Sequence, residues 1–161
     1  MSKRKANDAR QLALDELDAV IASGDVNAML NMINTLMANG VTPTPRQIAK
    51  ISAHIYKVND ANLAAEFGAQ FGAFGAYNDK LAEIVLEQGS AEDNYDFAMY
   101  VPNADRVAHG KAIRKKRSKM WWMAFARMWP MEANQIMMAS ARGKSEQAAV
   151  NNNEQEMAQS R

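Results

Sequence analysis

The spacing of the apolar residues constrains the fold of this 161-residue chain more than any other feature. In nearly every segment they recur at steps of three and four residues, the period of one helical face, rather than at the two-residue alternation of a half-buried strand. The first such stripe consists of Leu14, Leu17 and Ile21. Gly24 follows it as a stop. The pattern predicts an all-α protein.

The helix with the strongest start signals lies over residues 45–58. Thr44 is its predicted N-cap, Pro45 takes the first helical position, and Gln47 completes a capping box. An apolar stripe then runs from Ile48 to Val58 at helical spacing. These signals fix both the start and the buried face of this helix.

Glycines accompany the next helical stripe, which starts at about Asp60. Each glycine inside a helix costs roughly 1 kcal/mol relative to alanine, so something must compensate. One interpretation is a tight crossing, in which another helix backbone approaches the small residues. The other is that Gly72 or Gly75 ends the helix. The stripe carries Leu63, Phe67, Phe71 and Phe74, with Gly68, Gly72 and Gly75 beside them.

A helix-start signal recurs along the chain. It appears at residues 23–27, 58–62 and 88–92, spaced 35 and then 30 residues apart. This period suits a helix-turn-helix unit. The last signal follows a short helix that ends at Gly89, and it opens a helix that Pro102 stops.

Residues 96–105, Asp-Phe-Ala-Met-Tyr-Val-Pro-Asn-Ala-Asp, complete the last unit. This unit of about 30 residues resembles the degenerate α-helical repeats of uncharacterised bacterial and phage proteins, with a fainter echo at residues 60–71. The resemblance implies an architecture and no chemistry. We expect residues 11–105 to form stacked helical hairpins, a short α-solenoid-like bundle with a shared core.

Charge is strongly segregated along the chain, although its net value is only +1. Residues 11–105 hold thirteen acids against four basic groups, whereas residues 106–127 hold eight basic groups and no acid. Residues 1–10 are also basic, and we expect them to form an N-terminal arm. A dense stretch of one sign is solvated, meets a polyanion, or lies on an acidic surface such as the rest of this chain.

The basic stretch and an aromatic cluster fall on one predicted long helix, from the N-cap Asn103 to Trp129, just before Pro130. Charge occupies its first half and large aromatic residues its second. The candidate partner or nucleic-acid contacts are Arg106, Lys111, Arg114, Lys115, Lys116, Arg117, Lys119, Trp121, Trp122, Phe125 and Trp129.

Three interpretations of this basic and aromatic segment remain open. Its apolar end packs into the protein's own core or an oligomer interface, while the basic half is solvated or faces the acidic region. Alternatively, the cations neutralise phosphates, and exposed tryptophans stack on bases or wedge into a groove. In the third, the tryptophans sit at the headgroup level of a membrane.

A further helix is expected over residues 132–141, with a stop near Gly143. We treat residues 106–143 as one basic and aromatic arm, and residues 144–161 as a polar, flexible tail. Methionine is enriched in the arm, and flexible thioethers suit either a partner interface or an ordinary core. These methionines are Met120, Met123, Met128, Met131, Met137 and Met138.

Catalytic motifs are missing from the sequence. The chain has no cysteine, and we find neither a nucleophile elbow nor a phosphate-binding glycine loop. His54 is expected to be packed or half-exposed beside the apolar stripe of its helix. His109 lies in the basic segment, within reach of a phosphate. We expect no catalytic residue, no cofactor, no metal and no small-molecule substrate.

The leading prediction is a non-enzymatic helical interaction protein that contacts its partners through residues 106–138. We expect it to act within a larger assembly, such as a phage virion or a host-directed inhibitory complex. The favoured partner is another protein or a second copy of this chain. The alternatives are binding to nucleic acid and binding to a membrane surface. The longest apolar run, residues 120–126, is far shorter than the roughly 20 residues of a membrane span. We therefore expect a cytoplasmic protein, located in the host cytoplasm or in the virion if it is encoded by a phage.

Overall fold

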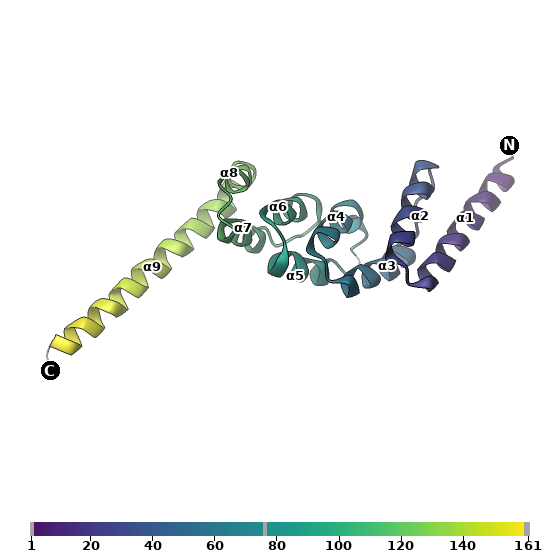
Figure 1. The fold of residues 1–161 in the computed structure, drawn as a ribbon. Coiled ribbons are helices and arrows are strands. Elements are labelled where there is room, and N and C mark those ends of the chain that lie inside the picture. Colours follow the sequence, from purple (N-terminus) through teal and green to yellow (C-terminus); the bar gives the residue numbers. More distant parts are fainter. Residues whose placement is uncertain (1, 76, 160–161) are drawn as a thin grey trace.

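The computed structural model describes residues 2–75 and 77–159 of the chain. All regular elements in these ranges are helical, and they stack into an elongated molecule whose termini lie at opposite ends (Figure 1). The predicted all-α fold of stacked helices is confirmed. In chain order the elements are α1 (Lys3–Ser23), α2 (Val26–Ala38), α3 (Pro45–Val58), α4 (Ala61–Phe71), the 3₁₀ turn η1 (Gly72–Phe74), α5 (Asn78–Gln88), α6 (Ala91–Tyr100), α7 (Arg106–Lys115), α8 (Lys119–Met128) and α9 (Pro130–Gln159).

The helices of the stack begin where the sequence places N-caps. The three recurring signals supply Asp25, Asp60 and Ser90 as the N-caps of α2, α4 and α6. Each side chain accepts a hydrogen bond from the backbone N–H three residues later. α3 has the predicted capping box between Thr44 and Gln47. These bonds satisfy backbone donors that a helix start leaves free, so they fix where each helix begins.

α1 to α6 enclose the larger of two hydrophobic cores. Leu17 and Ile51 are among its completely buried side chains. Gln47 is buried beside them, and its Nε2 donates to the Leu14 carbonyl oxygen at 2.8 Å and to the Asp18 carboxylate at 2.9 Å. The residue that completes the capping box of α3 therefore also ties α3 to α1.

The described part of the predicted basic arm at residues 1–10 is continuous with the helix that follows it. Residues 3–10 form the first turns of α1, which runs without interruption from Lys3 to Ser23. Ser2 caps the helix, and the first buried side chain is Leu14. The basic turns are continuous with the helix because no breaking residue separates them from its apolar stripe.

Both interpretations of the glycine-rich segment hold in part. α4 packs closely on α6, and a Cβ on Gly68 would lie 2.8 Å from a ring carbon of Phe97. The glycine therefore permits the tight crossing that its spacing predicts. α4 nevertheless ends at Phe71, and Gly75 follows η1 with a left-handed φ of 73°. Phe74 lies in the 3₁₀ turn rather than in the helix.

The predicted continuous helix over residues 103–129 is wrong. α7 starts after the N-cap Asp105 and ends at Lys115, and α8 begins only after Ser118. Between them Arg117 adopts a left-handed φ of 55°, which reverses the chain. The Ser118 hydroxyl accepts from the Trp121 N–H, so a serine among lysines and arginines supplies a second helix start.

The expected stop near Gly143 is also wrong. α9 passes through Gly143 without a break and continues to Gln159. Its first part packs against α7 and α8, while the described side chains beyond Ser140 are all exposed. Ser140 therefore marks the end of the packed part of α9, and the rest of the same helix is solvated.

Glycine substitutions test the packing of the arm. Gly110 of α7 is crossed by Phe125 and Ile136, and a Cβ there would overlap both side chains. Gly110→Ala should lower the free energy of unfolding by about 1–3 kcal/mol, despite the gain of roughly 1 kcal/mol in helix propensity. Urea titration followed by circular dichroism measures the effect.

Gly143→Ala is the matched control, because no atom lies within 4 Å of the added methyl group. It should keep the unfolding midpoint and raise helicity slightly. Equal behaviour of the two variants would contradict the packing of α7 against α8 and α9.

Candidate functional site

The part of the arm that is predicted to contact partners, residues 106–138, folds around a second hydrophobic core. Phe125 is completely buried and Trp129 is 7% exposed. Their ring centroids lie 5.1 Å apart, and Tyr95 of α6 lies 5.6 Å from Trp129. These aromatic contacts pack the end of α8 against α6.

Phe125 and Trp129, which the sequence predicts as partner contacts, are buried in this core. Trp121 and Trp122 are half-buried at the edge of the same core. Trp122 lies parallel to Phe125, with centroids 5.6 Å apart. The rings are therefore used mainly for internal packing, which agrees with the first of the three interpretations.

His109 joins the two cores. It is completely buried, and its Nδ1 lies 2.9 Å from Oδ1 of Asn94. The Asn94 amide donates to the carbonyl oxygens of Val85 and Ser90, so Oδ1 accepts and His109 Nδ1 carries the proton. Burial lowers the pKa of His109 to about 4, although the Asp105 carboxylate opposes the shift. A neutral, enclosed imidazole positions α7 and leaves no phosphate contact at His109.

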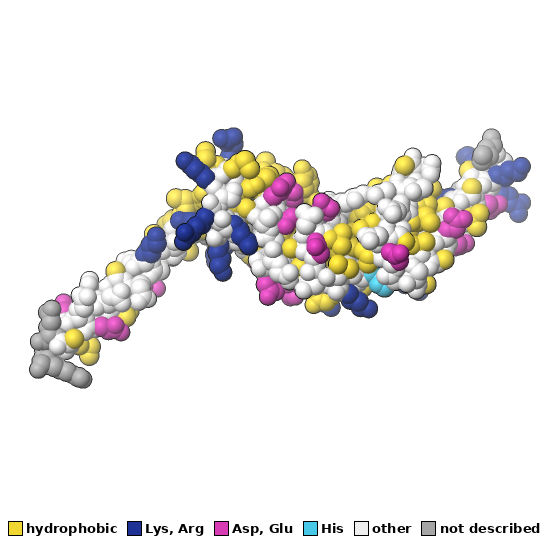
Figure 2. Space-filling model, in the orientation of Figure 1, with side chains coloured by type: hydrophobic (Ala, Val, Ile, Leu, Met, Phe, Trp, Pro, Cys, Tyr) yellow, Lys and Arg dark blue, Asp and Glu magenta, His cyan; other side chains and the backbone are white. Residues whose placement is uncertain are grey.

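The basic side chains of the arm are on the surface. Figure 2 shows dark-blue side chains gathered around α7 and α8, beside carboxylates of the stacked region. Within the described part of the chain, none of these cations forms an ion pair. Arg114 is half-buried, with its guanidinium 5.6 Å from the ring of Trp122. The exposed ones are Arg106, Lys111, Lys115, Lys116, Arg117, Lys119 and Arg127.

Methionines lie among these cations. Six of them on α8 and the first part of α9 are between 49% and 82% exposed. The side chains of the arm thus divide by type, with rings inside and thioethers outside. The six exposed methionines are Met120, Met123, Met128, Met131, Met137 and Met138.

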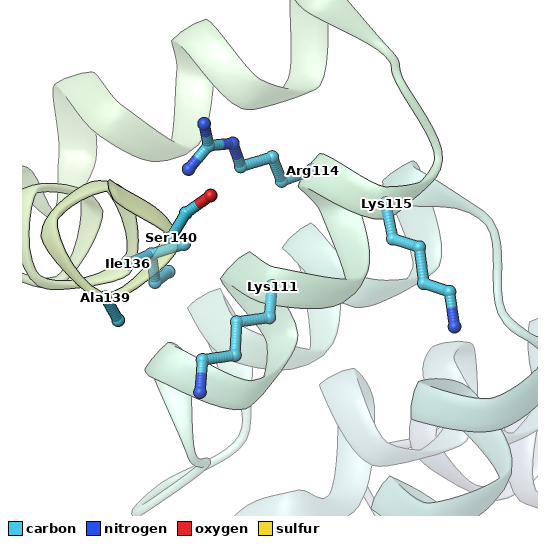
Figure 3. Close-up of a pocket in the computed structure, with 6 residues that line it drawn as sticks. All are labelled: Lys111, Arg114, Lys115, Ile136, Ala139 and Ser140. Atoms are coloured by element: carbon cyan, nitrogen blue, oxygen red, sulfur yellow. The ribbon is translucent and has the colours of Figure 1, made fainter. Parts of the chain in front are cut away.

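A cavity of about 400 Å³ opens between α7 and α9. Lys111, Arg114 and Lys115 line it from α7. Ile136, Ala139 and Ser140 line it from α9. In Figure 3 the guanidinium and the Ser140 hydroxyl point toward each other, while the two lysines extend in other directions.

Sequence reasoning missed the α9 side of this cavity. Ile136 and Ser140 are separated from the lysines by more than twenty residues and two chain reversals. Only the turn at residues 116–118 and the kink before Pro130 bring them together. A serine at helical spacing from an apolar residue carries no signal by itself.

In comparisons with known proteins, no family model, curated protein or solved structure matches the chain. None of the described helices has the length and apolar character needed to cross a membrane. The described residues also contain no group of three or more histidine, aspartate or glutamate side chains placed to hold a metal ion.

The buried imidazole predicts a specific pH dependence. His109 has a folded-state pKa of about 4, below its ordinary value of 6.5, so the unfolded chain takes up the proton first as pH falls. The contribution of this pKa difference to the free energy of unfolding is fully present above about pH 6.5. It is lost as the pH falls toward about 4, which lowers the free energy of unfolding by on the order of 3 kcal/mol.

His109→Asn keeps an N–H donor near Asn94 and cannot titrate. Its unfolding free energy should be lower at neutral pH, because the smaller side chain leaves a cavity, but should change less between pH 7 and pH 4.5. Chemical denaturation at a series of pH values measures both slopes. Parallel slopes for the two proteins would exclude His109 as the titrating group.

Proposed function

We propose that this chain is a non-enzymatic interaction protein that binds a macromolecular partner through the outer surface of the arm, residues 106–138. The observation that carries the proposal is the mixture of six exposed methionines and seven exposed cations on one rigid framework. Exposed apolar side chains gathered in one region mark interaction sites on soluble proteins. Thioethers adapt their shape to a partner at little conformational cost.

A second copy of the same chain is the partner that charge complementarity favours. The stacked region, residues 11–105, carries thirteen carboxylates against four cations, and the arm carries the opposite excess. No described residue of this stacked framework forms an ion pair, so the exposed charges of both regions are available to another molecule. Contact between the arm of one copy and the stacked region of the next is a head-to-tail arrangement.

The assembly would be a larger particle. The resemblance of residues 96–105 to helical repeats of bacterial and phage proteins supports a phage virion or a host-directed inhibitory complex. On this proposal the protein acts in the host cytoplasm or in the virion.

Nucleic-acid binding is the second candidate, and the unpaired cations of α7 and α8 support it. Binding would rest on phosphate contacts, because Phe125 and Trp129 are buried and cannot stack on bases. Membrane-surface binding loses most of its basis, since it depended on these aromatic side chains.

Light scattering coupled to size-exclusion chromatography tests self-association. At about 50 mM salt we expect a mass above the 17.8 kDa of one chain, falling toward it at about 500 mM as the charges are screened. The triple variant Met120→Gln, Met123→Gln, Met131→Gln should shift the equilibrium to the monomer. Val150→Gln, at an exposed apolar position further along α9, is the control and should assemble normally.

A monomer at both salt concentrations would contradict self-association. If that monomer bound labelled DNA or RNA with an affinity that falls steeply with salt, the second candidate would take its place.

A further inference from the structure

We propose that the cavity between α7 and α9 is a binding site for a phosphate group. The proposal goes beyond the interaction surface described above, because self-association through methionines and charges does not require an occupant here. The shared ligand chemistry is a phosphate oxyanion, which a free phosphate ester or a nucleic-acid backbone can supply.

Arg114 provides the first argument. Its Nη1 is buried and has no hydrogen-bond acceptor among the described residues. A buried charged donor without an acceptor is unfavourable, and a guanidinium presents its N–H groups in a planar fork that matches a phosphate. The ring of Trp122, 5.6 Å away, helps to hold the guanidinium at the cavity wall. The ring contact thus positions the group, while its Nη1 has no acceptor among the described residues.

The composition of the lining provides the second argument. Three cations and the Ser140 hydroxyl surround the cavity, and no carboxylate lines it. Lys111 and Lys115 are exposed and flexible, so their ammonium groups can turn inward to a bound anion. One guanidinium fork, two ammonium groups and a hydroxyl offer more donors than a carboxylate can accept, whereas a phosphate has three oxygens to share among them.

The apolar part of the lining provides the third argument. Ile136 and Ala139 form a wall on the α9 side, next to the hydroxyl. A volume of about 400 Å³ exceeds what a bare phosphate fills, so space remains for the organic group of an ester against this wall. Another cavity of similar size, about 350 Å³, is lined by Asp79, Glu83 and Asp105, and has no lysine or arginine. Two further cavities contain cations, Arg46 and Lys50 in one and Lys80 in the other, but each also has a carboxylate in its lining. A cationic lining without a carboxylate therefore distinguishes the α7–α9 cavity from these three.

Titration of the full-length protein with inorganic phosphate at low ionic strength tests the proposal. Isothermal calorimetry gives the stoichiometry, and tryptophan fluorescence reports the neighbourhood of Arg114 through Trp122. We expect saturable binding with one phosphate per chain. The double variant Lys111→Gln, Lys115→Gln should weaken it by about tenfold or more, and Arg114→Lys, which keeps the charge but loses the fork, should weaken it similarly.

The matched control is Lys116→Gln, Lys119→Gln. It removes two exposed cations from the same arm, but neither lines the cavity. We expect less than about threefold loss of affinity, because solvent and salt screen charges that do not touch the ligand. Circular dichroism should report unchanged helicity for both pairs, since all four lysines are exposed.

Equal weakening by the two pairs would overturn the proposal, because it would mean a diffuse charge effect without a defined site. Absence of saturation up to about 10 mM phosphate would also overturn it. A nucleoside monophosphate and a single-stranded oligonucleotide are titrated in the same way. Tighter binding of one of them identifies the source of the phosphate. Light scattering on the same samples separates the outcomes, since phosphate binding by a strict monomer keeps this proposal and rejects self-association.

Discussion

The contact of Phe125 with Gly110 determines how the whole arm is arranged. Only a glycine at this point of α7 lets the ring approach the helix backbone so closely. The approach folds α8 back over α7, and Trp129 and Ile136 then complete the second core. The direction of α9, the cavity beside it and the outward placement of the methionines all follow from this one packing arrangement.

On the proposed function, the arm would bind its partner without exposing its aromatic rings. Large rings are rigid and bury much area, so they stabilise a small core built from few residues. Thioethers and ammonium groups cover that core from outside, where their flexibility suits a partner surface. His109 and Asn94 connect the second core to the first, so the arm keeps a fixed orientation relative to the acidic region.

Short-range signals made the stacked region predictable from sequence. Asp25, Asp60 and Ser90 start helices because each side chain bonds a backbone N–H three residues away, which involves no distant part of the chain. The reversal at Arg117 was not predictable in this way, since helical spacing continues through it and the fold-back depends on packing against Gly110. The α9 side of the cavity was missed for the same reason. The course of α9 beyond residue 143 was missed because its polar composition carries no helical stripe.

The far part of α9, residues 141–159, extends about 28 Å at the rise of an α-helix. Its described side chains are exposed, and a helix of this length that buries no apolar face exchanges rapidly between helical and unwound forms in water. A molecule that settles along this extension must first hold it in one shape, and that entropic cost reduces the net affinity. Binding of a partner to residues 141–159 would consequently be weak and readily reversible.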